Sequence, residues 1–236
     1  MKVWRGRRVP EYRHECATTR WVAYFDLLGM RNLVSSAGIL SVFRAYQQAI
    51  ETLARRDQVR CAWFSDSFLI FTSDDSVPSF VYIEPACRWF AFLLLLKGVP
   101  ARGAITRGEL YADERARVYI GPALVEAYEC GENQDWIGFV LTPAAAQQLA
   151  ALKLPVDEQR DYRRYAIPFK QPPESANDYA ACVIGNWNRI LPDRRNQSIE
   201  LLEEMLGRQS DARVRRKYEN TLEFLRTHEP PAAAAE

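Results

Sequence analysis

The order of its apolar segments constrains the fold of this 236-residue chain more than any other feature. Short runs rich in aromatic and β-branched residues alternate with longer segments in which apolar residues recur at helical spacing. Two of the short runs, 59–64 and 68–72, are separated only by the tripeptide Ser-Asp-Ser at 65–67, which predicts a hairpin. Residues 98–113 predict a second hairpin with glycines at its bends.

Further elements are predicted on both sides of these runs. Strands are expected at 20–28, 136–142, 164–170 and 180–187, and helices at 31–56, 79–97, 121–130, 143–152 and 196–227. Thr142 is expected to cap the helix at 143–152. The order begins β-α-β-β-α-β-β-α-β. Such an order predicts an α+β fold of ferredoxin-like plan, with a mixed, mostly antiparallel sheet covered by helices on one face.

Composition divides the chain into four predicted regions. Residues 1–19 predict a basic N-terminal arm, 20–190 the main domain, 191–227 a C-terminal helical extension and 228–236 a flexible tail. One apolar stripe runs along the extension: Val214, Tyr218, Leu222 and Leu225. Such a stripe favours packing against the main domain over a site for a partner protein.

The same composition argues against several classes of function. The formal net charge of +1 argues against bulk binding to nucleic acid or to an anionic membrane. Five scattered cysteines argue against a disulfide framework and structural zinc, and two histidines argue against histidine-based catalysis. The first residues lack the apolar core of a signal peptide, and the most apolar run, 89–96, is too short to span a bilayer. We therefore expect a cytoplasmic protein.

Two aspartates interrupt apolar runs. Asp26 lies in WVAYFDLLGM, near the end of the first predicted strand, and Asp66 lies at the turn of the first hairpin. Either aspartate alone is also typical of a turn or a helix cap. If the first strand pairs beside the hairpin, however, both carboxylates reach one edge of the sheet. Two adjacent carboxylates repel unless a cation neutralises them, and Mg²⁺ or Mn²⁺ prefers carboxylate, phosphate and water oxygens.

Four short motifs, in order along the chain, resemble those of the class III nucleotide cyclases. They are YFDLLGM at 24–30, RCAWFSD at 60–66, RGAITRG at 102–108 and GPALVEAYE at 121–129. The resemblance covers a little over half of the chain. It implies that residues 20–190 form a cyclase catalytic domain, which assembles as a homodimer with composite active sites at the interface.

The resemblance also implies roles for particular residues. Asp26 and Asp66 would bind two divalent cations (Mn²⁺ or Mg²⁺), with Leu27 as a further metal ligand. Backbone amides after Asp26 would hold the triphosphate, Arg102 would contact its β- and γ-phosphates, and Lys170 and Tyr24 would also bind the substrate. The amides in question belong to Leu27, Leu28, Gly29 and Met30.

The chain departs from the family pattern at positions that recognise the nucleotide base and at positions that stabilise the transition state. Purine cyclases carry a base-reading lysine and aspartate where this chain has Ala62 and Val118, and a transition-state asparagine and arginine where it has Val125 and Glu129. The phrases SDS, ARGAI, GPALVEAYE, IPFK and NW are similar to those of the pyrimidine cyclases of the bacterial Pycsar antiphage system. This similarity implies UTP, or CTP, as substrate and a separate effector that senses the cyclic nucleotide.

Other residues and other functions stay open. Candidates for a pyrimidine pocket are Tyr24, Trp63, Phe64 and Tyr119, and candidates for transition-state charge are Arg107, Arg115 and Arg117. Three alternatives compete with a pyrimidine cyclase: a purine cyclase with an altered base pocket, an inactive nucleotide-binding relative, and a nucleic-acid-binding ferredoxin-like domain. Near-neutral charge and the lack of an aromatic RNA-binding signature weigh against the last.

Overall fold

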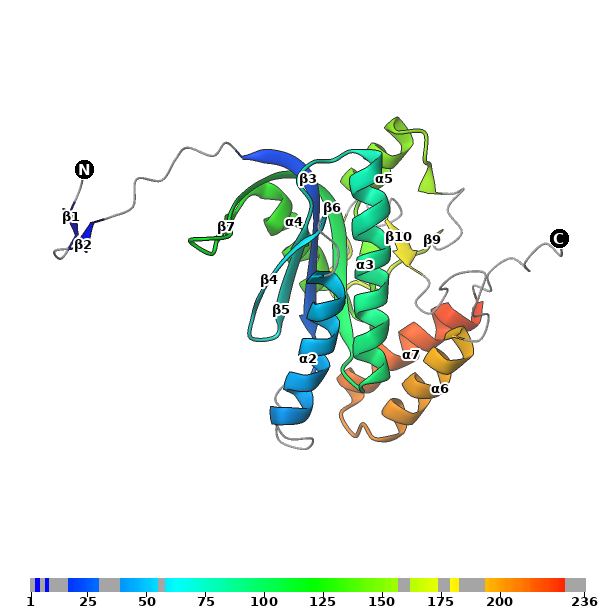
Figure 1. The fold of residues 1–236 in the computed structure, drawn as a ribbon. Helices are drawn as coiled ribbons and strands as arrows, with labels where there is room; N and C mark the ends of the chain where they lie inside the picture. The colour runs from blue at the N-terminus through cyan, green and yellow to red at the C-terminus, as the bar shows by residue number, and fades with distance from the viewer. Residues whose placement is uncertain are drawn as a thin grey trace, which may run out of the picture.

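One mixed sheet organises the molecule (Figure 1). The computed structural model describes residues 3–4, 7–8, 17–29, 39–54, 58–156, 162–173, 179–182 and 194–227. The strands lie in the order β4 (Arg60–Phe64), β5 (Ser67–Phe71), β3 (Thr18–Leu27), β6 (Ala101–Asp113), β8 (Gly138–Leu141), β10 (Ala180–Cys182) and β9 (Tyr162–Arg164). Strand β7 (Val118–Ile120) pairs with β6, and only the β6–β8 pair is parallel among those in the described residues. A separate pair joins β1 (Val3–Trp4) to β2 (Arg7–Arg8).

Helices lie on both faces of this sheet (Figure 1). One face is covered by α2 (Ile39–Ala54), α3 (Val77–Leu96) and α5 (Pro143–Ala151), and the opposite face by α4 (Pro122–Asn133). The C-terminal pair, α6 (Arg194–Gly207) and α7 (Ala212–Thr227), packs at one end of the sheet. The predicted α+β fold with a mostly antiparallel sheet is therefore confirmed. The expectation that helices cover one face is wrong for α4.

The alternation of β3 explains the two faces. Trp21, Ala23, Phe25 and Leu27 are buried against the α2–α3 side. Val22 is buried on the other side, against Ala123 of α4. Because successive side chains point to opposite faces, Asp26 shares the α4 side with Val22.

Helix α3 is the core helix of the domain. Its N-cap Ser76 accepts a hydrogen bond from the amide of Ser79, and Pro78 lies in its first turn. Among the described residues it is the one helix long and apolar enough to cross a membrane, but 67% of that apolar window is buried inside the molecule. Burial of this kind is what a core helix requires.

Several predicted elements are confirmed. The hairpin at β4 and β5 turns at Ser65 and Asp66, the first strand ends at Leu27, and α5 begins after the predicted cap Thr142. The C-terminal stripe packs on its own domain, because Tyr218, Leu222 and Leu225 join the core around Trp136. Predicted positions 31–38, 183–193 and 228–236 lie outside the described residues.

Two predicted elements are wrong. Residues 98–113 contain no hairpin, because Ala101–Asp113 is a single strand whose glycines allow close contacts. A Cβ atom on Gly103 would lie 2.3 Å from the carbonyl oxygen of Tyr24. The predicted strand at 164–170 is also absent: β9 ends at Arg164, and only Phe169 forms an isolated bridge, with Gln134. Pro168 lacks the amide hydrogen that a central strand would need there.

Candidate active site

The sheet register brings the two aspartates to the same end of the sheet. Asp26 pairs with Ser67 of β5 on one side and with Arg102 of β6 on the other. The amide of Leu27 donates a hydrogen bond to the backbone carbonyl of Asp66 at 3.0 Å. Residues 26 and 66 are therefore neighbours across the sheet, although 40 positions separate them in the chain.

Arg102 connects Asp26 to the end of α4. Its Nε and Nη2 donate to Oδ2 of Asp26 at 3.1 and 2.9 Å, and Nη2 also donates to Oε2 of Glu132 at 2.7 Å. Its Nη1 donates to the carbonyl oxygens of Glu132 and Gln134 at 2.8 and 3.0 Å. The arginine side chain is only 6% exposed. All three of its nitrogens thus face protein acceptors.

Lys170 joins the same group of charges. Its Nζ donates to the carbonyl oxygen of Glu132, which also accepts Nη1 of Arg102. Its amide donates to the carbonyl of Asn133 at 2.8 Å, which fixes the backbone beside the end of α4. We call Asp26, Arg102, Glu132 and Lys170 the charged cluster.

Burial shifts the titration of two members of this cluster. Burial, against the opposing charge of Arg102 and with a further contribution from Glu132, raises the pKa of Asp26 to about 6. Burial and the positive charges of Arg102 and Lys217 lower the pKa of Lys170. Burial, followed by the charges of Asp66 and Asp26, raises the pKa of Tyr46 to about 12. The Tyr46 hydroxyl therefore lies in the field of both aspartates.

The donor set suits a hard divalent cation. Among the described residues no three His, Cys, Asp or Glu side chains gather as a metal-binding group. Mg²⁺, however, usually takes only one or two carboxylates, with substrate phosphates and water as its other ligands. Asp26 and Asp66 fit that requirement, and a carboxylate whose pKa burial has raised is one that a cation would keep ionised. Asp26 and Asp66 would hold this cation, and Arg102 already binds Oδ2 of Asp26.

Two of the backbone amides that were predicted to bind the triphosphate donate to carbonyl oxygens of the protein instead. The amide of Leu27 donates to Asp66, and the amide of Leu28 donates to the carbonyl of Pro100 at 2.8 Å. Gly29 is exposed with φ +74°, a conformation that glycine adopts without strain. Met30 lies outside the described residues. Of the four predicted amides, that of Gly29 is the described one best placed for a ligand.

A hollow of about 670 Å³ lies on the α4 side of strands β3, β4 and β5. We call it the aromatic hollow; it is lined by Tyr24, Cys61, Ala62, Trp63, Phe64, Ser67, Phe68, Leu69, Glu114, Arg117, Tyr119 and Leu124. All four aromatic residues predicted for a base pocket are therefore in it. The hydroxyl groups of Tyr24 and Ser67 are hydrogen-bonded at 2.9 Å. Arg117, in the β6–β7 turn, has φ +56°.

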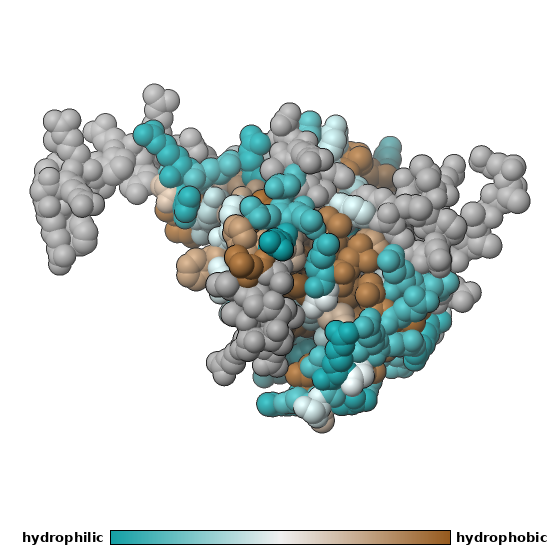
Figure 2. Space-filling view, turned by 60° about the horizontal axis from the view of Figure 1, so that its bottom comes forward, coloured by the Kyte–Doolittle hydropathy of each residue, from teal (hydrophilic) through white to brown (hydrophobic). Residues whose placement is uncertain are grey.

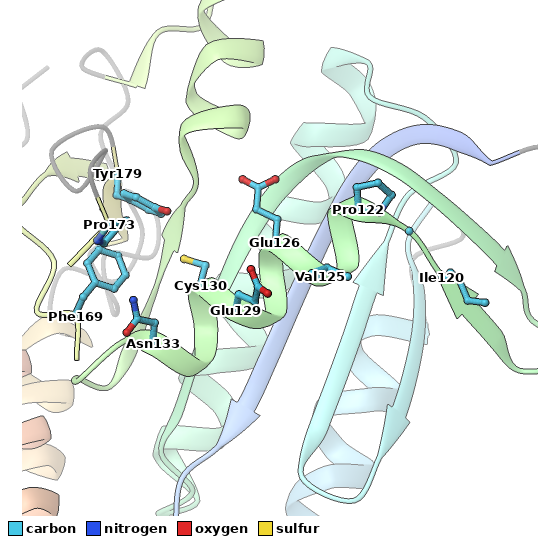
Figure 3. Close-up of a pocket in the computed structure, with 11 residues that line it drawn as sticks. Ile120, Pro122, Val125, Glu126, Glu129, Cys130, Asn133, Phe169, Pro173 and Tyr179 are labelled. Atoms are coloured by element: carbon cyan, nitrogen blue, oxygen red, sulfur yellow. The ribbon is translucent and has the colours of Figure 1, made fainter. Parts of the chain in front are cut away.

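A second hollow, of about 750 Å³, follows the outer side of α4 (Figure 3). Val125 and Glu129, at the positions of the family's transition-state residues, line it rather than the charged cluster. Phe169 and Tyr179 form its opposite wall.

Of the candidate arginines, Arg107 is bound to Asp75 at 2.9 Å and lies five residues along β6 from Arg102. It is therefore distant from Asp26.

The sequence interpretation missed the residues at the end of α4. Glu132 holds Arg102, and the fully buried Gln134 donates from Nε2 to the carbonyl of Gly103 at 2.8 Å. Two glycines in the sequence, Gly103 and Gly131, could have indicated this contact between α4 and β6. The Cβ that Gly131 lacks would lie 3.6 Å from Cα of Gly103, so the helix crosses the strand closely at this point. This close crossing is what brings Glu132 to Arg102.

Comparison with known proteins gives a fold but no close relative. No protein-family model matches the chain, and no curated protein sequence matches it. The adenylyl cyclase CyaB from P. aeruginosa superposes with a TM-score of 0.53 at 10% identity, over 75% of this chain and 98% of that one. A bacterial light-regulated adenylyl cyclase superposes with a TM-score of 0.50 at 8% identity, over 80% of this chain and 99% of that one. The chain therefore has the fold of class III nucleotide cyclase catalytic domains.

Proposed function

We propose that this protein is a pyrimidine nucleotide cyclase that converts UTP, or CTP, into the 3′,5′-cyclic nucleotide and pyrophosphate. The observation that carries the proposal is that the backbones at Asp26 and Asp66 are neighbours at one end of a cyclase-type sheet, where Arg102 binds Asp26. In the reaction the ribose 3′-oxygen forms a bond to the α-phosphorus while the bond to the β-phosphate oxygen breaks. The hydroxyl proton leaves to solvent, and pyrophosphate is released.

The roles of the residues follow from their contacts. Asp26 and Asp66 would hold Mg²⁺ or Mn²⁺, which supplies charge to activate the 3′-oxygen and to neutralise the phosphates. Arg102 fixes Oδ2 of Asp26 and thereby orients that carboxylate. A direct contact between Arg102 and the phosphates would require a phosphate oxygen to replace one of its protein acceptors. The Nζ of Lys170, which donates to one carbonyl oxygen among the described residues, would hold the phosphates more readily.

The aromatic hollow supports a pyrimidine rather than a purine. Ala62 lines it at the position where purine cyclases carry a base-reading lysine, so that charge is missing. Tyr24, Trp63 and Tyr119 offer flat apolar surfaces, and the Tyr24–Ser67 hydroxyl pair offers polar atoms to a base edge. A pyrimidine, which is smaller and has carbonyl oxygens on its edge, suits such a site.

A homodimer with composite active sites is part of the proposal. Large apolar side chains are exposed near the aromatic hollow and on α4: Trp63, Phe64, Ile120, Val125 and Tyr128. Burial of such a set is the usual driving force for association. The biological role follows from the resemblance: we propose that the cyclic nucleotide activates a separate effector in bacterial antiphage defence.

One assay tests this function directly. Purified protein is incubated with UTP, CTP, ATP or GTP and Mn²⁺ or Mg²⁺, and the products are identified by mass spectrometry. We expect a cyclic pyrimidine nucleotide, and a loss of about a thousandfold in rate for Asp26→Ala and Asp66→Ala, since metal ions supply several kcal/mol of transition-state stabilisation. Asp75→Ala, which removes an ion-paired carboxylate at the other end of the sheet, is the control. Full activity in a folded Asp26→Ala or Asp66→Ala variant would refute the metal assignment, and a cyclic purine product would favour the purine alternative.

A further inference from the structure

The short segment at the end of α4 collects cations from three separate elements. Arg102 of β6 and Lys170 both donate to the carbonyl oxygen of Glu132. Lys217 of α7 donates from Nζ to Oδ1 of Asp135 at 3.2 Å. Residues 132–135 are consecutive, so these three cations lie along one turn of chain. Lys217 belongs to the helical extension, which the motifs shared with cyclases do not cover.

The position of α7 relative to this segment is fixed by several hydrogen bonds. Nδ2 of Asn220 donates to the carbonyl of Asp135 at 2.8 Å, and the amide of Ile137 donates to Oγ1 of Thr221 at 2.8 Å. The amide of Asp135 in turn donates to the carbonyl of Pro168 at 2.6 Å, two residues before Lys170. The backbones that carry Lys170 and Lys217 are therefore both tied to residue 135.

The charges of this region favour an anion. Lys217 and Lys170 lie close enough for the positive charge of Lys217 to lower the pKa of Lys170, together with burial and Arg102. The side chains of Lys217 and Asp135 are 18% and 20% exposed, so the pair is partly shielded from water but open at one side. Figure 2 shows that the surface around α6 and α7 is largely hydrophilic. Cations placed side by side at some cost are typical of a polyphosphate site.

We infer that Lys217 of α7 is a further polyphosphate ligand, which acts beside Lys170 and which Asp135 holds in place while the ligand is absent. The inference rests on the proposed function for the identity of the natural ligand, a nucleoside triphosphate or the pyrophosphate it releases. The C-terminal extension thereby becomes part of the substrate site rather than an appendage that only packs on it.

Binding of inorganic tripolyphosphate in the presence of Mg²⁺, measured by calorimetry, tests the inference without any turnover. We expect Lys217→Gln to weaken binding about tenfold, which is the typical effect of one lost hydrogen bond to a charged group, and Lys217→Arg to retain most of it. Arg213→Gln is the matched control, because it removes one positive charge from the exposed side of the same helix. It should bind tripolyphosphate as the wild type does.

A second variant separates a ligand from a structural ion pair. Asp135→Asn breaks the same pair as Lys217→Gln, together with the pair that Asp135 forms with the exposed Arg216 at 3.5 Å, but it leaves the lysine and removes a negative charge. Tripolyphosphate should then bind as tightly as to the wild type, or more tightly. Equal weakening in both variants, or unchanged binding in Lys217→Gln, would overturn the inference. If Lys217→Gln does not fold, weakened binding in folded Asp135→Asn still overturns it.

The outcome is also separable from that of the proposed function. If the wild type turns over none of the four nucleotides but its tripolyphosphate binding depends on Lys217, the anion site stands and the cyclase proposal fails. If the wild type forms a cyclic nucleotide while Lys217→Gln leaves both tripolyphosphate affinity and KM unchanged, the cyclase proposal stands and Lys217 has no role in binding.

Discussion

The charged cluster and the aromatic hollow are built in opposite ways, although Tyr24 and Asp26 lie only two residues apart on β3. In the charged cluster, each side chain is held by another charged group or by a carbonyl oxygen, and Arg102 is almost fully buried. In the aromatic hollow, Glu114 and Arg117 are the charged lining residues among those that the structure describes, and Trp63 and Phe64 are exposed by 54% and 85%.

The difference matches two kinds of recognition. Phosphates and cations are recognised by charge, which requires groups with fixed positions and low exposure to water. A base is recognised by shape and stacking, together with a few hydrogen bonds. On the proposed function, the cluster therefore determines whether a nucleotide reacts, and the hollow determines which one binds.

The largest expected effect is a loss of stability when the charged cluster is disrupted. Arg102→Ala leaves Asp26 and two backbone carbonyls without their buried donor, so we expect unfolding free energy to fall by about 3–5 kcal/mol, as for other broken buried ion pairs. Arg60→Ala is the comparison from the edge of the hollow, where Arg60 and Glu114 form an exposed pair at 3.2 Å. That change should lower it by less than about 1 kcal/mol. Urea denaturation measures both, and similar losses would show that the two regions do not differ in this way.

The next effect is the dependence of stability on pH that results from Asp26 in the charged cluster. Because burial raises the pKa of Asp26 from 3.8 to about 6, the folded protein binds more protons than the unfolded chain between these values. Stability that depends on Asp26 is therefore lost as pH rises through this window. Relative to Asp26→Asn, the wild type should lose about 2 kcal/mol between pH 4.5 and pH 7.5 in the absence of divalent cations.

Denaturation at both pH values, with and without Mn²⁺, measures this difference. Mn²⁺ at pH 7.5 should restore stability to the wild type and have little effect on Asp26→Asn, because only an ionised carboxylate gains from the cation. A pH dependence that is the same in the two proteins would show that Asp26 is not the titrating group.

A smaller effect concerns the base. Ala62→Lys places in the hollow the positive charge that purine cyclases carry at this position, so we expect the ratio of kcat/KM for UTP to that for ATP to fall about tenfold. The affinity for inorganic tripolyphosphate should not change, because the charged cluster is untouched. A change in tripolyphosphate affinity alone would contradict the division of roles between the two regions.

The smallest effect removes one hydroxyl group. Tyr24→Phe loses the hydrogen bond to Ser67, so we expect the unfolding free energy to fall by about 1 kcal/mol and discrimination among bases to weaken. Ser67→Ala is the matched variant from the other side of the same bond. Thermal denaturation together with competition between UTP and ATP checks both, and opposite effects of the two variants would argue against a shared role for the pair.

Local patterns were sufficient to predict much of the fold. The Ser-Asp-Ser turn, the cap at Thr142 and the strand predicted at 20–28 each depend on residues close in sequence, and the structure has all three, with the strand at Thr18–Leu27. The glycines of 101–113 lead to a wrong prediction, because glycine is also typical of bends. Gly103 instead makes room for the neighbouring strand, a contact that no local pattern encodes.

The candidate site shows the same limit. The nearness of Asp26 and Asp66 could be inferred, because it required only that two predicted elements pair side by side. The parts played by Glu132 and Lys217 could not be inferred from the sequence. Their positions depend on where α4 ends and on how α7 packs, and helix packing is not specified by periodicity alone. The role of Arg102 in holding Asp26 likewise became visible only from the register of β3 and β6.

The hydrogen bonds from Thr221 to residue 137 have a consequence for how the protein is made. The Oγ1 of Thr221 accepts from the amide of Ile137 and donates to its carbonyl, while Phe224 packs edge-on against the ring of Trp136 at 5.2 Å. A ribosome must therefore synthesise the chain as far as Phe224 before residues 136 and 137, just ahead of β8, gain their final partners. A nascent chain stopped before residue 212 would carry both aspartates and still lack the support that fixes the end of α4.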